Sequence, residues 1–243
     1  MTLLRAEGLM LRRGGRLVLD GADLVVAEGE FVGLIGPNGA GKTTLMRAAL
    51  GLVPARGYSD LATLPPARRA RRAAWLPQAR EIAWPVPVAH LVGLGAQAGG
   101  RDAAAVTRAL ERTGLAAFAD RRATELSGGE QARALIARAL AQETPLLLAD
   151  EPIAGLDPAQ QIRSMEVFRA LAGEGRAVLA SLHDLGLAAR YCTRLVAMNA
   201  GRVVASGPPA DVLTPELMRA VFGVTAFFAD TPDGPVFQPL SVL

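Results

Sequence analysis

Short, uncharged apolar runs alternate along this chain with stretches whose apolar residues recur at helical spacing. FVGLI (31–35), LLLA (146–149) and AVLAS (177–181) carry no charge, as strands covered on both faces of a sheet do. ALERTGLAAFAD (109–120) and QARALIARALAQ (131–142) instead place their apolar residues on one helix face. This alternation predicts an α/β fold with a mainly parallel sheet.

Composition narrows the class of protein. With 243 residues, 51% of them hydrophobic, the chain can bury a substantial core as one domain, with or without an inserted subdomain. Cys192 is the only cysteine, which excludes a disulfide framework, and the opening MTLLRAEGL lacks the apolar core of a signal peptide. The uncharged run 82–100 contains Pro85, Pro87 and four glycines, so we expect a surface segment of a cytoplasmic protein and not a membrane span.

The charged residues show two features, one basic cluster and a single lysine. The net charge is +3, and the acidic residues are dispersed among the basic ones. We interpret RRARR (68–72) as a solvated helix face; contact with lipid head groups or a partner protein is the alternative, and nucleic acid is disfavoured because no aromatic residue interleaves the cluster. Lys42 is the only lysine of the chain, which marks a position where arginine does not serve.

The segment GPNGAGKT (36–43) fits the phosphate-loop pattern G-x-x-x-x-G-K-[ST], between an apolar run and a helical stretch. Its glycines let backbone N–H groups wrap a phosphate; they are Gly36, Gly39 and Gly41. Lys42 offers a compact charge to the β- and γ-phosphates, and the Thr43 hydroxyl can ligate Mg²⁺. We therefore predict a nucleotide site here; a chance glycine turn before a helix is the weaker alternative.

Two further runs end in groups suited to phosphate chemistry. Asp150 and Glu151 follow LLLA, and His183 follows AVLAS. Because the carboxyl ends of parallel strands meet at one edge of a sheet, these side chains are expected near the phosphate loop. Asp150 suits Mg²⁺, Glu151 suits orienting or deprotonating a water, and His183 suits a hydrogen bond to the γ-phosphate. Strand-capping acids and a structural histidine are the alternatives, and His90 is interpreted as structural.

LSGGE (126–130) starts a helix with a second bare, glycine-rich backbone, which is a further anion site. One nucleotide needs one phosphate cradle. The second site is explained if it serves a nucleotide held by another copy, as in a two-fold dimer with two shared sites. Loss of the γ-phosphate on hydrolysis would then open the pair.

The motifs GPNGAGKTT, LPQ (76–78), LSGGEQ, LLLADEP, AGLD (154–157) and SLHD, in this order, closely resemble the nucleotide-binding subunit of ATP-binding cassette transporters over nearly the whole chain. The resemblance implies an ATPase that uses Mg²⁺. It also implies a P-loop NTPase (RecA-like) core with an antiparallel β edge, formed by 1–78 and 144–243, with a helical subdomain inserted at 79–143, in one domain spanning 1–243.

The resemblance also assigns individual roles. It implies that Gln78 senses Mg²⁺ and the membrane partner, and that Asp157 lies in the dimer contact. The remaining residues expected to contact nucleotide, in the same copy or in the partner, are Asn38, Thr44, Ser127, Gly128 and Gly129. Two departures from the family pattern are Arg13, which stands where an aromatic residue stacks on adenine, and the short segment 51–66, where a strand of an edge hairpin is expected to be missing.

The final prediction concerns partners. IAWPVPVAHLVGLG (82–95) lies where the family docks a helix of a polytopic membrane permease, so we expect a charge at Val88 to weaken docking but not folding; a buried intramolecular segment is the alternative. A helix capped by Thr214 and a hairpin through TPDGP (231–235) resemble the ATPases of iron-siderophore, haem and cobalamin importers, which also work with a substrate-binding protein.

This resemblance places the chain at the cytoplasmic face of a bacterial inner membrane, as a homodimer with ATP at the interface and without a nucleic-acid partner. The alternatives are a soluble cassette ATPase that moves no substrate, such as one of iron–sulfur cluster assembly, and a motor for another cargo.

Overall fold

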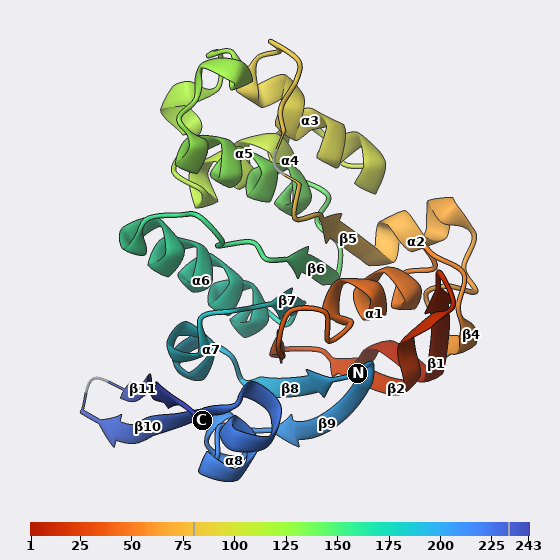
Figure 1. Cartoon of the computed structure of the whole chain (residues 1–243). Coiled ribbons are helices and arrows are strands. Elements are labelled where there is room, and N and C mark those ends of the chain that lie inside the picture. Colours follow the sequence, from red (N-terminus) through yellow and green to blue (C-terminus); the bar gives the residue numbers. More distant parts are fainter. Residues whose placement is uncertain (80, 233) are drawn as a thin grey trace.

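The computed structural model describes residues 1–79, 81–232 and 234–243, and its centre is a six-stranded sheet (Figure 1). In spatial order the strands are β5 (Ala73–Leu76), β6 (Leu146–Asp150), β7 (Ala177–Ser181), β3 (Phe31–Ile35), β8 (Arg194–Asn199) and β9 (Arg202–Gly207). The first five strands are parallel, and β9 runs antiparallel to β8. The predicted mainly parallel sheet is confirmed.

The central strands are buried on both faces, which explains why their sequences are uncharged apart from Asp150 at the end of β6. Every residue of β3, β6 and β7 is buried. Phe31 packs edge-on against Phe168 of α6 (Pro158–Gly173), with ring centroids 5.9 Å apart, whereas Val32 belongs to a second apolar cluster that also contains Leu45 of α1 (Lys42–Ala49). Because neighbouring strand residues point to opposite faces, each face acquires its own apolar layer.

A separate antiparallel sheet forms the predicted β edge. It consists of β2 (Arg16–Ala27), β1 (Thr2–Arg13) and β4 (Arg56–Ser59), in that order. Within the described residues, β4 is the one strand that segment 51–66 contributes, and the loss of a hairpin strand relative to the family stays a prediction. The next helix, α2 (Pro66–Arg72), carries the basic cluster, and its Arg68, Arg71 and Arg72 are exposed, as expected for a solvated face.

The helices between β5 and β6 gather beyond one end of the sheet in Figure 1. They are α3 (Val88–Gly99), α4 (Ala103–Arg112) and α5 (Gly128–Leu140), with short 3-10 turns at Ala116–Phe118 and Ala123–Glu125. This arrangement accords with an inserted helical subdomain, whose bounds at 79 and 143 remain a prediction. Within the described residues, none of the helices has the length and apolarity needed to cross a membrane.

The expectation for Val88 is wrong. Val88 and Val92 are 0% exposed and belong to the main apolar cluster, whereas Trp84 is 68% exposed. The apolar run is therefore a surface segment up to Pro87 and the buried face of a helix beyond it. A carboxylate at position 88 would be buried without compensation, so it would disrupt folding before it could report on docking.

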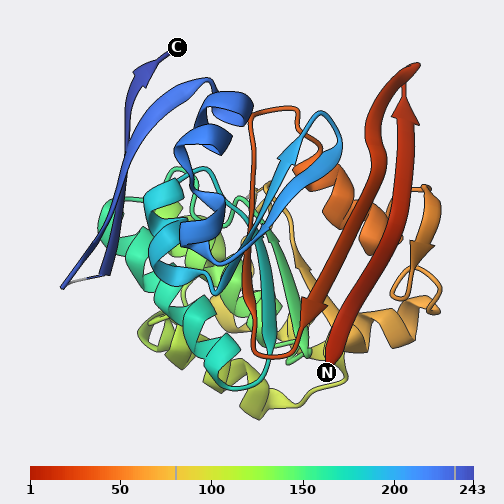
Figure 2. The same cartoon turned by 90° about the horizontal axis from the view of Figure 1, so that it is seen from below.

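The end of the chain forms the predicted helix and hairpin. The Thr214 hydroxyl accepts a hydrogen bond from Leu217 N at 3.2 Å and caps α9 (Pro215–Leu217), which continues as a π-helical turn, Met218–Phe222. Strands β10 (Val224–Thr231) and β11 (Gly234–Val242) pair antiparallel; Asp233 of the predicted turn lies outside the described residues. Figure 2 shows this hairpin and the β1–β2 ribbon on opposite sides of the molecule. The remaining helices are α7 (Leu185–Tyr191) and α8 (Pro209–Val212).

Candidate functional site

The phosphate loop joins β3 to α1 with a backbone that a side chain would obstruct. Gly41 is the N-cap residue of α1 and has φ 104°, and a Cβ there would lie 2.8 Å from the carbonyl oxygen of Val18. Among the described residues, no side chain caps this helix start. Its first-turn N–H groups therefore face the loop with the positive end of the helix dipole, which suits a phosphate.

Lys42 lies inside this loop and is 6% exposed. Its Nζ donates hydrogen bonds to the carbonyl oxygens of Gly36 at 2.7 Å and Pro37 at 3.2 Å. Burial lowers the pKa of the Lys42 ammonium, and the carboxylates of Glu151 and Asp150 act in the opposite direction. The loop therefore holds a buried cation whose charge is offset in part by two carboxylates and suits an anionic ligand.

Asp150 ends β6 beside the phosphate loop, as predicted. Its Oδ1 accepts hydrogen bonds from Thr43 Oγ1 at 3.0 Å and from Ser181 Oγ at 2.8 Å. Its Oδ2 is buried and has no hydrogen-bond partner among the described residues. A buried carboxylate oxygen without a donor, next to a hydroxyl group, fits the oxygen ligands that Mg²⁺ prefers.

Glu151 brings the other predicted catalytic residues together. Its Oε2 accepts a hydrogen bond from Gln78 Nε2 at 2.8 Å, and its Oε1 lies 2.7 Å from His183 Nε2. The Glu151 backbone is left-handed, with φ 48°, a conformation that costs a non-glycine residue on the order of 1 kcal/mol and is concentrated at functional sites.

Ser181, which was not predicted from the sequence, fixes this backbone. The Ser181 hydroxyl accepts a hydrogen bond from Glu151 N at 2.8 Å while donating to Asp150. The one sequence signal for Ser181 was a polar residue at the end of an apolar run. Ser181 therefore ties the Asp150 carboxylate to the backbone of Glu151.

The second glycine-rich helix start is differently built. Ser127 is the N-cap residue of α5, and its hydroxyl accepts a hydrogen bond from Glu130 N at 3.4 Å. Glu130 Oε2 in turn accepts hydrogen bonds from Ser127 N and Ser127 Oγ, both at 2.8 Å. These bonds, first that from the Ser127 hydroxyl, lower the pKa of the Glu130 carboxyl group.

The two helix starts are separate within one chain. None of the hydrogen bonds recorded for the described residues joins Ser127, Gly128 or Gly129 to the phosphate loop. Asp157 caps α6 through a 3.0 Å hydrogen bond from Gln160 N to Asp157 Oδ1.

The remaining predicted contacts are Asn38 and Thr44, in and next to the phosphate loop, and Arg13, for which no contact with the loop is observed among the described residues. Arg13 is exposed at the end of β1, Asn38 is exposed in the loop, and Thr44 is half-buried on α1. A cavity of about 540 Å³ borders the loop at Gly36–Asn38 and reaches His183 and the carboxyl-terminal hairpin.

Comparison with known proteins identifies the family to which this fold belongs. A family model described as "ABC transporter" matches residues 19–154, more than half of the chain. The cobalamin import ATP-binding protein BtuD of Halobacterium salinarum is 46% identical over 232 residues, which cover 90% of this chain and 58% of that protein. The hemin import ATP-binding protein HmuV of Bordetella pertussis is 44% identical over 243 residues, which cover 92% of this chain and 93% of that protein.

Solved structures agree with the sequence comparisons. A chain of an ABC transporter in an inward-facing conformation superposes with a TM-score of 0.85 and covers 99% of this chain and 98% of its own, and its 24% identity supports the fold alone. An ATP-binding subunit of an ABC transporter, at 30% identity, has a TM-score of 0.78 and covers 86% of this chain and 91% of its own. The chain belongs to the ABC transporter family.

Proposed function

We propose that this chain is the ATP-hydrolysing subunit of an importer and that it works as a homodimer with MgATP at two shared sites. The observation that carries the proposal is the convergence of Gln78 and His183 on Glu151, immediately beyond the Thr43–Asp150 pair. A positioned carboxylate at the open edge of a parallel sheet, next to a phosphate loop, is suited to hydrolysis of a nucleoside triphosphate.

Each side chain has a role in this proposal. Thr43 and Asp150 would hold Mg²⁺, with Gln78 near it, and the bound ion would supply positive charge that offsets the charge of the phosphates. The loop backbone, Lys42, Asn38 and Thr44 hold the phosphates, and Arg13 stacks its guanidinium plane on the adenine.

Glu151 orients and deprotonates the attacking water. Its two oxygens are engaged by Gln78 and His183, which hold the carboxylate in one direction. His183 donates a hydrogen bond to the γ-phosphate once it turns away from Glu151.

The dimer completes each site. Ser127, Gly128 and Gly129 of one protomer contact the γ-phosphate held by the other, and Asp157 lies in the contact between protomers. Hydrolysis removes the group that both protomers bind, so the dimer opens and drives a second element that has two states.

We further propose an iron chelate, haem or cobalamin as the cargo, because the relatives are named for cobalamin and hemin import. The membrane partner is a polytopic permease at the cytoplasmic face of a bacterial inner membrane, which receives cargo from a substrate-binding protein. Trp84 and the surface segment up to Pro87 are its contact, because this uncharged apolar segment is contiguous and largely exposed, with Trp84 68% exposed.

Glu151→Gln tests the chemistry. The amide keeps the shape but loses the base, so turnover falls at least ~10²-fold while MgATP binding persists. Size-exclusion chromatography with MgATP then shows a trapped dimer. A fully active variant, or one that remains monomeric with MgATP, contradicts the assignment.

Transport tests the partner and the cargo. Vesicles that contain the permease and this chain should take up one of the three cargoes in an ATP-dependent manner. Trp84→Glu should weaken assembly with the permease while ATP binding is kept, and Val204→Glu, at a 48% exposed residue of β9, is the matched control. Co-purification with a soluble cluster-assembly complex and no membrane subunit would defeat the proposal.

A further inference from the structure

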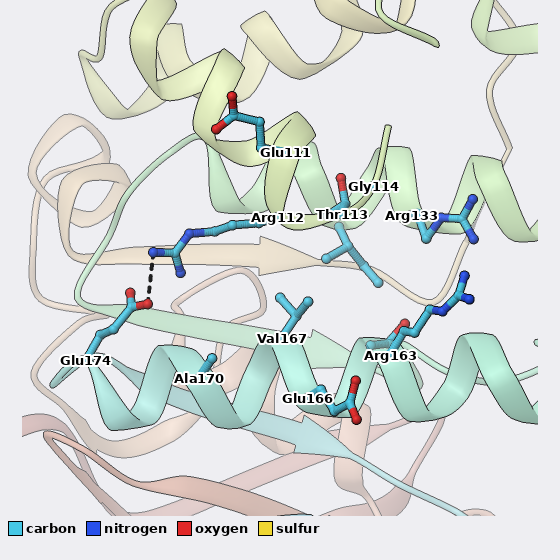
Figure 3. Close-up of a pocket in the computed structure, with 12 residues that line it drawn as sticks. Glu111, Arg112, Thr113, Gly114, Arg133, Arg163, Glu166, Val167, Ala170 and Glu174 are labelled. Carbon is cyan, nitrogen blue, oxygen red and sulfur yellow. Dashed lines mark ion pairs between the residues drawn. The ribbon is translucent and has the colours of Figure 1, made fainter. Parts of the chain in front are cut away.

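A cleft of about 710 Å³ separates α5 and the end of α4 from α6 (Figure 3). At one end Arg112 Nη2 and Glu174 Oε1 form an ion pair at 2.9 Å, and this pair joins α4 to the residue that follows α6. At the other end Arg133 of α5 and Arg163 of α6 extend from facing helices. Helix α5 begins at the Ser127–Gly129 anion site and α6 begins at Asp157, so this boundary connects the two segments proposed to meet a partner copy.

Two buried polar atoms at this boundary have no hydrogen-bond partner among the described residues. One is Arg133 Nε, which is a donor, and the other is Gln160 Oε1, which is an acceptor. A buried polar group without a partner costs about 1–3 kcal/mol, so such groups are rare unless another state satisfies them. The two atoms belong to facing helices and are chemically complementary.

The Gln160 carboxamide lies against the start of α5. A Cβ built on Gly129 would overlap the amide group of Gln160, so glycine is needed for this packing. Arg133 follows Gly129 by one helical turn on the same face of α5, about 5–6 Å along the helix. The two unpartnered atoms therefore belong to residues about one helical turn apart along this boundary.

We infer that Gln160 is a positioning residue for the composite nucleotide site. When two copies close on ATP, Arg133 Nε donates a hydrogen bond to Gln160 Oε1, and this bond fixes Gly129 and the first turn of α5 against the partner's γ-phosphate. The backbone of Gln160 meanwhile holds Asp157 through its 3.0 Å hydrogen bond, so a single residue links both contacts with the partner. This inference rests on the proposed dimeric function.

Substitution of Gln160 should affect the affinity of one copy for nucleotide and the affinity of two copies for each other differently. Gln160 does not contact the phosphate loop of its own chain within the described hydrogen-bond network, so the affinity of a single copy for nucleotide should not depend on it. The dissociation constant of the ATP-bound dimer, and turnover, should depend on it. A merely structural role would lower thermal stability and single-copy affinity as well.

The test uses the full chain in a Glu151→Gln background, where MgATP should hold the dimer. Gln160→Leu should raise the dimer dissociation constant about 2- to 10-fold, the range that one hydrogen bond supports, as measured by sedimentation velocity. MgADP affinity by calorimetry should stay unchanged, and the thermal midpoint should not fall, because leucine removes an acceptor that has no partner in the single copy. Gln160→Glu should keep or tighten the dimer, because a carboxylate accepts more strongly from a guanidinium group.

A double substitution and a control variant complete the experiment. Arg133→Leu combined with Gln160→Leu should weaken the dimer no more than Gln160→Leu alone, since both changes remove the same bond. Glu166→Leu, at an exposed position of α6 in the same cleft, should leave the dimer constant unchanged.

Three results would overturn the inference: an unaltered dimer constant in Gln160→Leu, independent additive effects of the two substitutions, or a parallel loss of thermal stability and MgADP affinity. The Glu151→Gln protein must itself dimerise with MgATP. If it stays monomeric, the proposed function fails; if it dimerises and the Gln160 variants match it, this inference alone fails.

Discussion

The two glycine-rich helix starts of this chain have opposite designs. The start of α1 is buried, and the only lysine of the chain is bonded to the carbonyl groups of its own loop. The start of α5 is largely exposed, and the Glu130 carboxylate bonds back to the Ser127 backbone and hydroxyl. The first start supplies a cation to its ligand, whereas the second already holds an anion.

This difference indicates that the two sites receive a phosphate group in different ways. A phosphate can enter the first site without displacing any side-chain cap. At the second site, a phosphate approaching Ser127 meets the carboxylate of Glu130 and must replace or rearrange its hydrogen bonds. The second site is therefore suited to a ligand already bound elsewhere, such as a nucleotide presented by another copy.

The largest effect should come from Lys42. Lys42→Ala removes the cation of the first site and should lower ATPase activity about 10²- to 10³-fold, as loss of a preorganised electrostatic group does. Lys42→Arg should fail as well, because the planar guanidinium group is wider than the ammonium group that the loop encloses. Steady-state ATPase assays check both variants, and near-normal turnover of the arginine form would refute this account of the lone lysine.

A methyl group at the second site should have the next largest effect. Gly129→Ala places a Cβ onto the Gln160 amide group, so the end of that side chain must move, and the substitution should cost about 1–2 kcal/mol of unfolding free energy, the lower part of the overpacking range. Gly128→Ala is the matched control, because a Cβ there meets nothing within 4 Å, so alanine should be neutral or stabilising by up to about 1 kcal/mol. Urea unfolding distinguishes them, and equal stability of the two variants would contradict the packing described here.

Ser127→Ala should cost less. The substitution removes the side-chain cap of α5, which is worth about 1 kcal/mol of unfolding free energy. Ser127→Asn restores a capping side chain and should recover most of that loss. Thermal unfolding monitored by circular dichroism tests the pair; a stable alanine variant would mean that Glu130 alone holds the helix start.

The smallest effect should be the pH dependence of the Glu130 contact. The folded-state pKa of Glu130 is lowered below its ordinary value of 4.5, so its contribution to stability is present above pH 4.5 and is lost as pH falls through the folded-state pKa. The difference in unfolding free energy between the wild type and Glu130→Gln should therefore be seen at pH 7 and shrink by pH 3. A difference that stays constant between these pH values would show that charge is not involved.

Most of the correct predictions came from patterns of residues that are neighbours in the sequence. Neighbouring residues in the chain determine the uncharged runs of β3, β6 and β7 and the loop between β3 and α1. The edge of the sheet, the phosphate loop and the carboxylates could therefore be placed together from the sequence. The prediction for Val88 failed for a non-local reason. An apolar helix face looks the same in sequence whether the same chain or a partner covers it, and here other helices of the same chain do.

Gln160 and Ser181 escaped prediction for a related reason. Their importance lies in contacts with Gly129, Asp150 and Glu151, which are distant in sequence and meet only in the folded chain. A polar residue on a helix or at the end of a strand does not by itself identify the residues that it contacts in the folded chain.

The buried position of Lys42 also makes the chain a reporter of its own occupancy. An amine-directed acylating reagent meets one lysine side chain in the whole sequence, besides the amino group of Met1, which lies 3.5 Å from Glu28 at the surface. Because Lys42 is buried and bonded to its own loop, acylation requires the loop to open, and a bound phosphate that covers Lys42 should suppress the reaction further, so the acylation rate falls as the site fills. Mass spectrometry of a single peptide could then follow nucleotide exchange in an intact membrane assembly without a fluorescent label or a turnover assay.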